Sequence, residues 1–456
     1  MLFNSYEFIF IFLPIVFFLF YMMSRYQIAA LSLIIFSSLI FYSFWNLRLL
    51  PIIMISIAIN YCFVKLLERR SNMILLAIGI LINIGLLGYF KYYNFFIDNI
   101  NYLLSTNIEV PNVVLPLAIS FFTFQQSGYL VDTYRGETKG QTFGEYVLFV
   151  VFFPQLIAGP IVRHGEIIPQ IRDRALQRLQ FDNIEKGLTI FFIGLFKKAV
   201  IADTLAHWVS NGFNNSSQLN VVEGWISALS YTFQLYFDFS GYCDMAIGIA
   251  LLFNIKLPIN FDSPYKSLNI QQFWQKWHMT LNRFLTHYLY IPLGGSLKGR
   301  LRTYVNILLV FLVSGLWHGA GWTFIFWGLL HGLASVIYRV WKHLGLRLFT
   351  PIAWGITFLF VICSWVFFRA NSMDVAMDVL QAMIRFDQLS LPIIWGEKYI
   401  LFGLFVLFLV VVGTKNSIAI IDSHHPGWRR TLFVACLAAI SFIHLNQVSE
   451  FLYFNF

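Results

Sequence analysis

Long apolar segments recur along almost all of this 456-residue chain, and they constrain its fold more than any other feature. Thirteen segments qualify as candidates, at residues 8–23, 28–44, 49–67, 73–90, 113–131, 146–158, 188–202, 225–253, 304–317, 322–338, 352–368, 399–413 and 432–443. A membrane-spanning helix needs roughly 20 mostly apolar residues, and several of these are too short to span alone. We therefore predict an all-α polytopic membrane protein with about 11 transmembrane helices.

The composition agrees with a membrane protein and excludes other classes. Charged residues make up 12% of the chain and hydrophobic residues 58%, whereas soluble domains carry about 25% charged residues. The net charge of +9 is attributed to cytoplasmic loops, so no nucleic-acid partner is expected. The four cysteines stand apart in apolar segments, with neither metal-ligand nor disulfide spacing. We predict no metal site and no bound cofactor.

The distribution of basic residues predicts the orientation in the membrane. Lys and Arg gather at residues 65–70, 163–178, 256–302 and 339–347, while 92–111 and 203–223 contain none. The positive-inside rule places the basic segments in the cytoplasm and the others outside, which puts the N-terminus outside. Residues 8–23 follow no basic region and no cleavage site closes them, so we expect a retained first helix. We predict one membrane domain over residues 1–456.

Two segments are predicted to serve other purposes than spanning. Residues 146–158 run into Gly159 and Pro160, so we expect a re-entrant or protein-buried segment. Residues 267–292 carry apolar side chains at helical spacing, which predicts one amphipathic helix, capped by Ser267 or Asn269 and ended near Pro292. His278 lies on the flank of its apolar stripe. Two interpretations stay open: an interfacial histidine beside tryptophans, or a group that points into a polar cavity.

His318 is the most unusual ionisable residue, because it interrupts a strongly apolar stretch. A titratable group in such surroundings is costly and commonly marks a functional site, although it can simply hydrogen-bond a neighbouring helix. Glycines 315, 319 and 321 surround it, which allows either close backbone approach or space for a ligand walled by Trp317 and Trp322. His331 is a second polar candidate in this region, whereas residues 207, 424 and 425 are histidines in predicted loops.

Polar residues also interrupt two other apolar segments. Asp238, Ser240, Tyr242 and Asp244 fall within one candidate span and are expected to face the protein interior, where they either hold helices together or line a polar tunnel. Arg163 follows the broken segment at Pro160. It either binds a phosphate or carboxylate or anchors a membrane edge.

Five ordered motifs and an aromatic tail together resemble the membrane-bound O-acyltransferase (MBOAT) family. The closer match is its bacterial branch, typified by the membrane subunit of alginate O-acetyltransferase. The resemblance rests on residues 3–10 (FNSYEFIF), 153–163 (FPQLIAGPIVR), 236–248 (YFDFSGYCDMAIG), 273–281 (FWQKWHMTL), 317–322 (WHGAGW) and 451–456 (FLYFNF). It covers nearly the whole chain. The family's D-alanyl-transferring branch matches less well around 155–163.

The resemblance implies an acyltransferase with a central funnel in a bacterial inner membrane. His318 matches the family's catalytic histidine, and His278 matches a second functional position that is asparagine in some members. Tunnel or donor-binding roles are assigned to Trp274, Trp277, Trp317, Asp238, Ser240, Tyr242, Asp244 and Arg163. The acyl thioester, acetyl-CoA above all, is expected to enter from the cytoplasm, and the acceptor from outside. A separate extracytoplasmic SGNH-hydrolase-like partner is expected to place the acyl group on a glycan.

The residues suit that chemistry, since transfer from a thioester to a hydroxyl needs a base and oxyanion stabilisation. Neutral His318 in a dry site is the predicted general base, with His278 binding the donor or sharing the proton. Two alternatives stay open. One is transfer of D-alanine or a longer acyl group from a carrier protein, which labelled donors would distinguish. The other is a lipid-linked sugar transporter, which the lack of evident internal repeats disfavours.

Overall fold

The computed structural model describes residues 1–110, 113–173, 176, 178–386, 395–422, 427–445 and 452. Pro111, Arg174, His424, His425 and the aromatic tail apart from Leu452 lie outside the described residues. All regular elements within these ranges are helices, so the all-α fold class is confirmed. The chain forms two compact units, which are Met1–Phe191 with Tyr242–Pro258, and Phe192–Gly241 with Ile259–Phe456.

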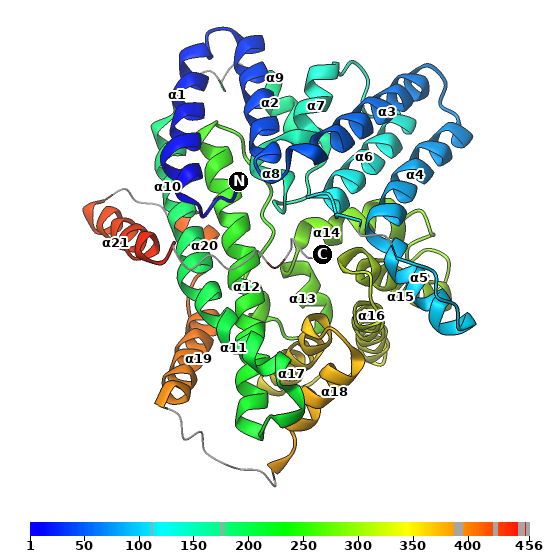
Figure 1. Cartoon of the computed structure of the whole chain (residues 1–456), viewed down its shortest axis with the longest axis vertical. Helices are drawn as coiled ribbons and strands as arrows, with labels where there is room; N and C mark the ends of the chain where they lie inside the picture. The colour runs from blue at the N-terminus through cyan, green and yellow to red at the C-terminus, as the bar shows by residue number, and fades with distance from the viewer. Residues whose placement is uncertain are drawn as a thin grey trace. The chain divides into compact units, whose positions relative to one another are not determined.

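The first unit contains the N-terminal helices, drawn from blue through cyan to green in Figure 1. They are η1 (Glu7–Phe12), α1 (Leu13–Met23), α2 (Gln27–Ser43), η2 (Leu47–Leu49), α3 (Leu50–Arg69), α4 (Met73–Leu87), η3 (Gly88–Tyr92), α5 (Tyr93–Leu104), α6 (Ile119–Tyr134), α7 (Phe143–Val151), α8 (Phe153–Leu156), α9 (His164–Arg172) and most of α10 (Phe181–Phe196). Helices α3, α4 and α6 pack against one another, as do α1 with α2 and α2 with α7. A buried pair of amides, Asn60 on α3 and Asn83 on α4, joins two of these helices by reciprocal hydrogen bonds.

The broken segment at residues 146–158 is buried in protein, as predicted. A capping box of Thr142 and Glu145 starts α7, because the Thr142 hydroxyl accepts from Glu145 N and the Glu145 carboxylate accepts from Thr142 N. The side chains from Tyr146 onward are inaccessible. Irregular backbone at this depth therefore has protein, not lipid, around it.

The second unit contains the remaining helices. They are η5 (Lys197–Ala202), α11 (Asp203–Asn214), η6 (Ser216–Gln218), the first two thirds of α12 (Val221–Leu252), η7 (Pro264–Lys266), α13 (Ile270–Lys276), α14 (Met279–Leu285), η8 (Thr286–Tyr290), α15 (Arg300–His318), α16 (Trp322–His343), α17 (Thr350–Arg369), α18 (Met373–Ala382), α19 (Trp395–Gly413), α20 (Ser417–Asp422) and α21 (Trp428–His444). Helix α16 packs against α15, α13 and α17 (Figure 1).

Six helices of the described part are long and apolar enough to cross a membrane. They are Leu47–Arg69, Met73–Leu104, Val221–Leu252, Arg300–His318, Trp322–His343 and Thr350–Arg369, and shorter apolar helices lie at Glu7–Met23, Gln27–Ser43 and Tyr399–Gly413. A multi-pass membrane protein is therefore confirmed, while the count of about 11 spans stays a prediction. Almost every residue of α12 is buried, so Asp238 and Asp244 face protein, as predicted.

A buried ion-pair cluster joins α12 to the segment that precedes α11. Lys198 Nζ lies 2.7 Å from a carboxylate oxygen of Asp203 and 2.7 Å from one of Asp238. All three side chains are at most 2% exposed. Two lysines within the apolar segment 188–202 were a sequence signal for such a cluster, because an intramembrane charge needs a partner.

Replacing Lys198 by methionine is expected to destabilise the protein by about 3–5 kcal/mol, because two buried carboxylates then share a site without a cation. Thermal unfolding in detergent measures this. The double variant Lys198→Met, Asp238→Asn should recover part of the loss, since it removes one of the two charges. Equal stability of the wild type and the single variant would show that the cluster contributes nothing.

Candidate active site

His318 is the last residue of α15, and aromatic rings enclose it. The imidazole centroid lies 5.0 Å from the Trp317 ring, 5.2 Å from the Trp327 ring and 5.1 Å from the Phe368 ring, all three in edge-to-face arrangements. His318 is 1% exposed. Helices α15, α16 and α17 thus contribute one wall each to a buried, aromatic environment.

The glycines beside His318 serve close helix packing. A Cβ atom on Gly315 would lie 2.4 Å from the carbonyl oxygen of Phe324, and one on Gly328 would lie 2.4 Å from that of Phe311. A Cβ on Gly319 would overlap the Phe324 ring. Of the two roles that the sequence left open for Gly315 and Gly319, the structure shows close approach of α15 and α16. Trp322 is largely exposed, and a role for it as a wall of a space at His318 stays a prediction.

The prediction of one continuous amphipathic helix over residues 267–292 is wrong at its centre. Helix α13 ends at Lys276, and His278 adopts a left-handed conformation with φ 45° and ψ 49° before α14 begins. Such a conformation cannot continue a right-handed helix, and periodicity alone does not reveal it. The predicted cap is confirmed at Asn269, whose side chain accepts from Gln272 N. The apolar positions are buried up to Leu285.

The segment around Asn260 stabilises this break. Met279 N donates to Asn260 O and Asp262 N donates to Lys276 O, each over 3.0 Å. The Oδ1 atom of Asn260 accepts from Thr280 N over 3.1 Å and from Thr280 Oγ1 over 2.9 Å. Asn260 therefore caps α14 from a distant part of the chain. The groups that a continuous helix would have bonded internally find these partners instead.

The break places His278 next to His318. The two imidazole centroids are 6.2 Å apart, and Trp317 contacts both rings. Phe239 of α12 packs edge-on against His278 at 4.8 Å. Burial lowers the pKa of His278 from 6.5 to about 3, so its imidazole is neutral at physiological pH. The structure thus brings together His278, His318 and Trp317 within the second unit.

Both ring nitrogens of His331 form hydrogen bonds to neighbouring side chains. Trp274 Nε1 donates to Nδ1 over 3.1 Å, and the opposite nitrogen lies 3.0 Å from Ser364 Oγ. Ser364 itself donates to Val361 O, so its oxygen accepts from His331 Nε2. His331 thereby joins α13, α16 and α17 as a neutral ring.

We expect His331→Phe to lower stability by about 1–3 kcal/mol, because the indole N–H of Trp274 loses its buried acceptor. Thermal unfolding and activity per folded molecule should be measured together. Most of the activity of the folded fraction should remain. A loss of activity without a loss of stability would instead assign His331 to the chemistry.

Two further predicted residues lie in the same aromatic cluster. The Trp274 ring contacts Trp327 at 5.8 Å, and the Trp277 ring contacts Trp365 at 4.9 Å. Trp327 and Trp365 stack on each other at 5.7 Å. Trp274 and Trp277 therefore reach His318 through intervening rings, and their donor-binding role stays a prediction.

The four polar residues of α12 divide between the two units. Asp238 pairs with Lys198 as described above, and its second oxygen accepts from Leu452 N over 3.2 Å. Ser240 is buried on the same part of the helix. Tyr242 and Asp244 are buried in the first unit, where the Tyr242 ring stacks on Phe3 at 4.7 Å. These contacts give Asp238 and Tyr242 structural partners, and a tunnel role for the four stays a prediction.

Arg163 belongs to a polar cluster in the first unit. Its guanidinium lies 3.2 Å from Glu137 and 3.5 Å from Asp132, and His164 Nδ1 lies 3.0 Å from Asp132. The ligand atoms of Asp132, Glu137 and His164 are within 4.8 Å of one another, a geometry that sequence spacing did not predict. Arg163 lies within ion-pair distance of both carboxylates, so the cluster is interpreted as an ion-pair network.

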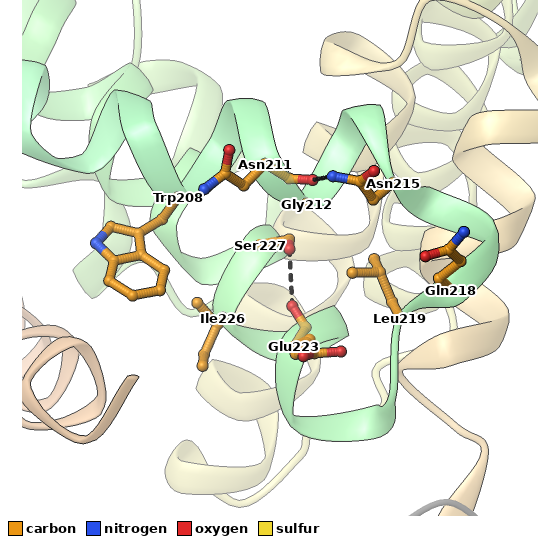
Figure 2. A pocket seen from close by; sticks show the side chains of 9 residues that line it. All are labelled: Trp208, Asn211, Gly212, Asn215, Gln218, Leu219, Glu223, Ile226 and Ser227. Carbon is orange, nitrogen blue, oxygen red and sulfur yellow. Dashed lines mark hydrogen bonds between the residues drawn. The ribbon is translucent and has the colours of Figure 1, made fainter. Parts of the chain in front are cut away.

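A cavity of about 420 Å³ lies elsewhere in the second unit, at α11, η6 and the start of α12 (Figure 2). Polar side chains of Asn211, Asn215, Gln218 and Glu223 line it, together with Trp208. No residue predicted from the sequence as catalytic or donor-binding is among its lining residues, so the histidine pair, rather than this cavity, defines the candidate site.

Sequence reasoning missed three contributors to the site. Trp327 and Phe368 contact His318, and Asn260 contacts His278. The aromatic residues carry no signal in a chain with 50 phenylalanines and 13 tryptophans. Asn260 was visible as a polar residue between apolar ones, but only the fold shows that it faces residue 278.

Sequence comparison assigns the class of this all-α membrane protein with its buried histidine pair. The profile described as MBOAT, membrane-bound O-acyltransferase family, matches residues 142–375, which is about half of the chain. The chain therefore belongs to the membrane-bound O-acyltransferase family.

Individual relatives agree with that assignment. Peptidoglycan O-acetyltransferase of Helicobacter pylori is 44% identical over all of this chain and 98% of its own. The probable alginate O-acetylase AlgI of Azotobacter vinelandii is 37% identical over 86% of this chain and 79% of its own. Teichoic acid D-alanyltransferase of Streptococcus thermophilus is 29% identical over 49% of this chain and 57% of its own.

These findings confirm an acyltransferase of the bacterial MBOAT type that is embedded in the membrane. They decide against the transporter alternative.

Proposed function

We propose that this protein transfers acetyl groups from a cytoplasmic thioester, acetyl-CoA above all, to a cell-surface glycan. The observation that carries the proposal is the pair of buried histidines, His318 and His278, with ring centroids 6.2 Å apart inside an aromatic enclosure. At this separation both rings are close enough to contact the same pair of reacting groups, the acceptor hydroxyl and the thioester.

The chemistry needs one proton to move. His318, as the neutral base, accepts the proton of the acceptor hydroxyl while that oxygen attacks the thioester carbonyl. The tetrahedral intermediate collapses with cleavage of the C–S bond, and the thiolate that leaves takes up the proton from His318. The products are the ester and the free thiol, and the imidazole is neutral again. His278 binds the donor or shares the proton.

The charge distribution supports a direction for the transfer. The segment at α11, residues 203–223, contains no Lys or Arg, whereas 256–302, around α13 and α14, is rich in both. The positive-inside rule then orients α12 with its start outside and its end in the cytoplasm. In this orientation the donor approaches from the side of the basic segment, and the N-terminus lies outside the inner membrane. A separate SGNH-hydrolase-like protein outside would receive the acetyl group and place it on the glycan.

Peptidoglycan is the acceptor that the relatives favour, since the peptidoglycan O-acetyltransferase matches over the full length of both chains. Inside-out vesicles from cells that produce the protein together with its SGNH-hydrolase-like partner would receive radiolabelled acetyl donor outside, with peptidoglycan or alginate enclosed. We expect label in peptidoglycan that a His318 variant does not transfer. Label in alginate alone would overturn the acceptor and leave the activity, and label in neither glycan would overturn the function.

D-alanyl transfer is the second candidate, because the teichoic acid D-alanyltransferases also match. Their similarity covers only about half of this chain. The same vesicles, supplied with D-alanyl carrier protein in place of acetyl-CoA, separate the two donors. Transfer of D-alanine and not of acetyl would reverse the preference.

A further inference from the structure

One side-chain oxygen, Oδ1 of Asn260, meets three groups at the break between α13 and α14. Thr280 N lies 3.1 Å away, Thr280 Oγ1 lies 2.9 Å away, and His278 Nδ1 lies 3.1 Å away. All three residues are at most 2% exposed. A backbone N–H can only donate, so the atom that faces Thr280 N must be the amide oxygen. The backbone therefore fixes the orientation of the Asn260 amide.

The tautomer of His278 follows from that orientation. Because Asn260 Oδ1 only accepts, the nitrogen facing it, His278 Nδ1, must carry a hydrogen. Burial keeps the pKa of this imidazole low, and a neutral imidazole holds a single N–H. The other nitrogen, Nε2, then carries the lone pair.

We propose that Asn260 is a positioning residue, which holds His278 as the Nδ1–H tautomer so that Nε2 serves the reaction as an acceptor. This inference rests on the proposed role of His278 and makes it more specific. A nitrogen that carries a lone pair can accept a hydrogen bond or a proton. The donor would be the hydroxyl of the acyl acceptor or the thiol that is released. Such a nitrogen cannot donate a hydrogen bond to the oxyanion, so Asn260 assigns His278 to the handling of the proton.

The charged side chains near His278 form ion pairs with other residues. His318 is the titratable ring beside it. Asp262 pairs with Lys276 at 3.9 Å near the surface, and Asp238, next to Phe239 in the chain, pairs with Lys198. The group opposite Nδ1–H is thus a neutral amide. A carboxylate in the same place would stabilise the imidazolium and raise the pKa of His278.

Asn260 also caps α14, so this structural role must be distinguished from the positioning of His278. Three variants distinguish the two roles. Asn260→Asp keeps an acceptor for all three donors but adds charge. Asn260→Leu removes the acceptor at similar volume. Thr280→Val is the matched control, because it deletes one donor to the same oxygen and leaves the contact to His278 in place.

Nuclear magnetic resonance of protein with isotope-labelled histidine reads the tautomer directly. The signals of His278 are assigned by their loss in His278→Asn. We expect a protonated Nδ1 and an unprotonated Nε2 in the wild type and in Thr280→Val, and loss of this preference in Asn260→Leu. A protonated Nε2 in the wild type, or an unchanged tautomer in a folded Asn260→Leu protein, would overturn the inference. This measurement does not depend on turnover.

The pH profile of acyl transfer gives the second readout. In Asn260→Asp the pKa of His278 rises, so the rate should begin to fall at a higher pH as the solution is acidified. Thr280→Val should keep the profile of the wild type even if it unfolds more easily. In Asn260→Leu we expect kcat to drop by at least about 10-fold. Unchanged pH profiles in all three variants would show that Asn260 only caps α14. Absence of acyl transfer by the wild type would count against the proposed function and not against the role of Asn260.

Discussion

Replacing His318 by alanine is expected to reduce acyl transfer by about 100- to 10,000-fold, the range that a general base contributes. The His318 ring is the proposed base, and it packs against the rings of Trp317, Trp327 and Phe368. Alanine leaves a small cavity among these rings, so some stability is lost as well. Transfer of radiolabelled acetyl groups per folded molecule, with folding checked by thermal unfolding, measures the two effects separately.

His331→Ala is the matched control for that experiment. His331 is also a fully buried histidine, on the helix that packs against α15, and it contacts the same Trp327 ring. Its loss should affect stability at least as much as the loss of His318, because two hydrogen bonds go with it. If both variants keep the same activity per folded molecule, His318 is not the base.

Changes at His278 are expected to separate backbone conformation from side-chain chemistry. The left-handed φ of 45° favours glycine and tolerates asparagine. His278→Gly should therefore fold at least as well at the break, yet lose about 100-fold in activity because no side chain reaches the site. His278→Asn should fold and keep part of the activity, since its amide can still hydrogen-bond the donor. The transfer rates and thermal stabilities of the two variants should be compared side by side. The comparison shows whether the side chain of residue 278 takes part in the reaction.

His278→Ala completes the series, because it lacks the side chain and also strains the backbone by about 1–2 kcal/mol, as the native histidine does. We expect its activity to match that of the glycine variant. An active glycine variant would refute a chemical role for His278 and leave it as a residue of the helix break.

The membrane class and the presence of a buried histidine at position 318 were predictable because both depend on local composition. Apolar length identifies spans without knowledge of the fold, and a single histidine in the apolar stretch before α16 is costly wherever the helix packs. The buried position of residues 146–158 was likewise predictable, since the prolines and glycine at its end cannot form a regular helix against lipid.

The break at His278 was not predictable from periodicity. Residues 270–285 keep their apolar spacing on both sides of the break, so the pattern favours one helix. The alternative is stabilised by Asn260 and Asp262, which lie many residues earlier and bond the backbone at Met279 and Lys276. Only the tertiary fold brings these partners together.

The sequence by itself determined that this chain is a membrane protein and that His318 is its most unusual residue, because apolar length and an ionisable residue within an apolar stretch can both be read from local sequence. The tertiary structure decided which polar groups meet. It separated His318 from His331, whose two nitrogens both serve structure, and it paired Lys198 with Asp203 and Asp238. It also turned His278 out of a helix and toward Asn260, since hydrogen-bond partners are set by position in space.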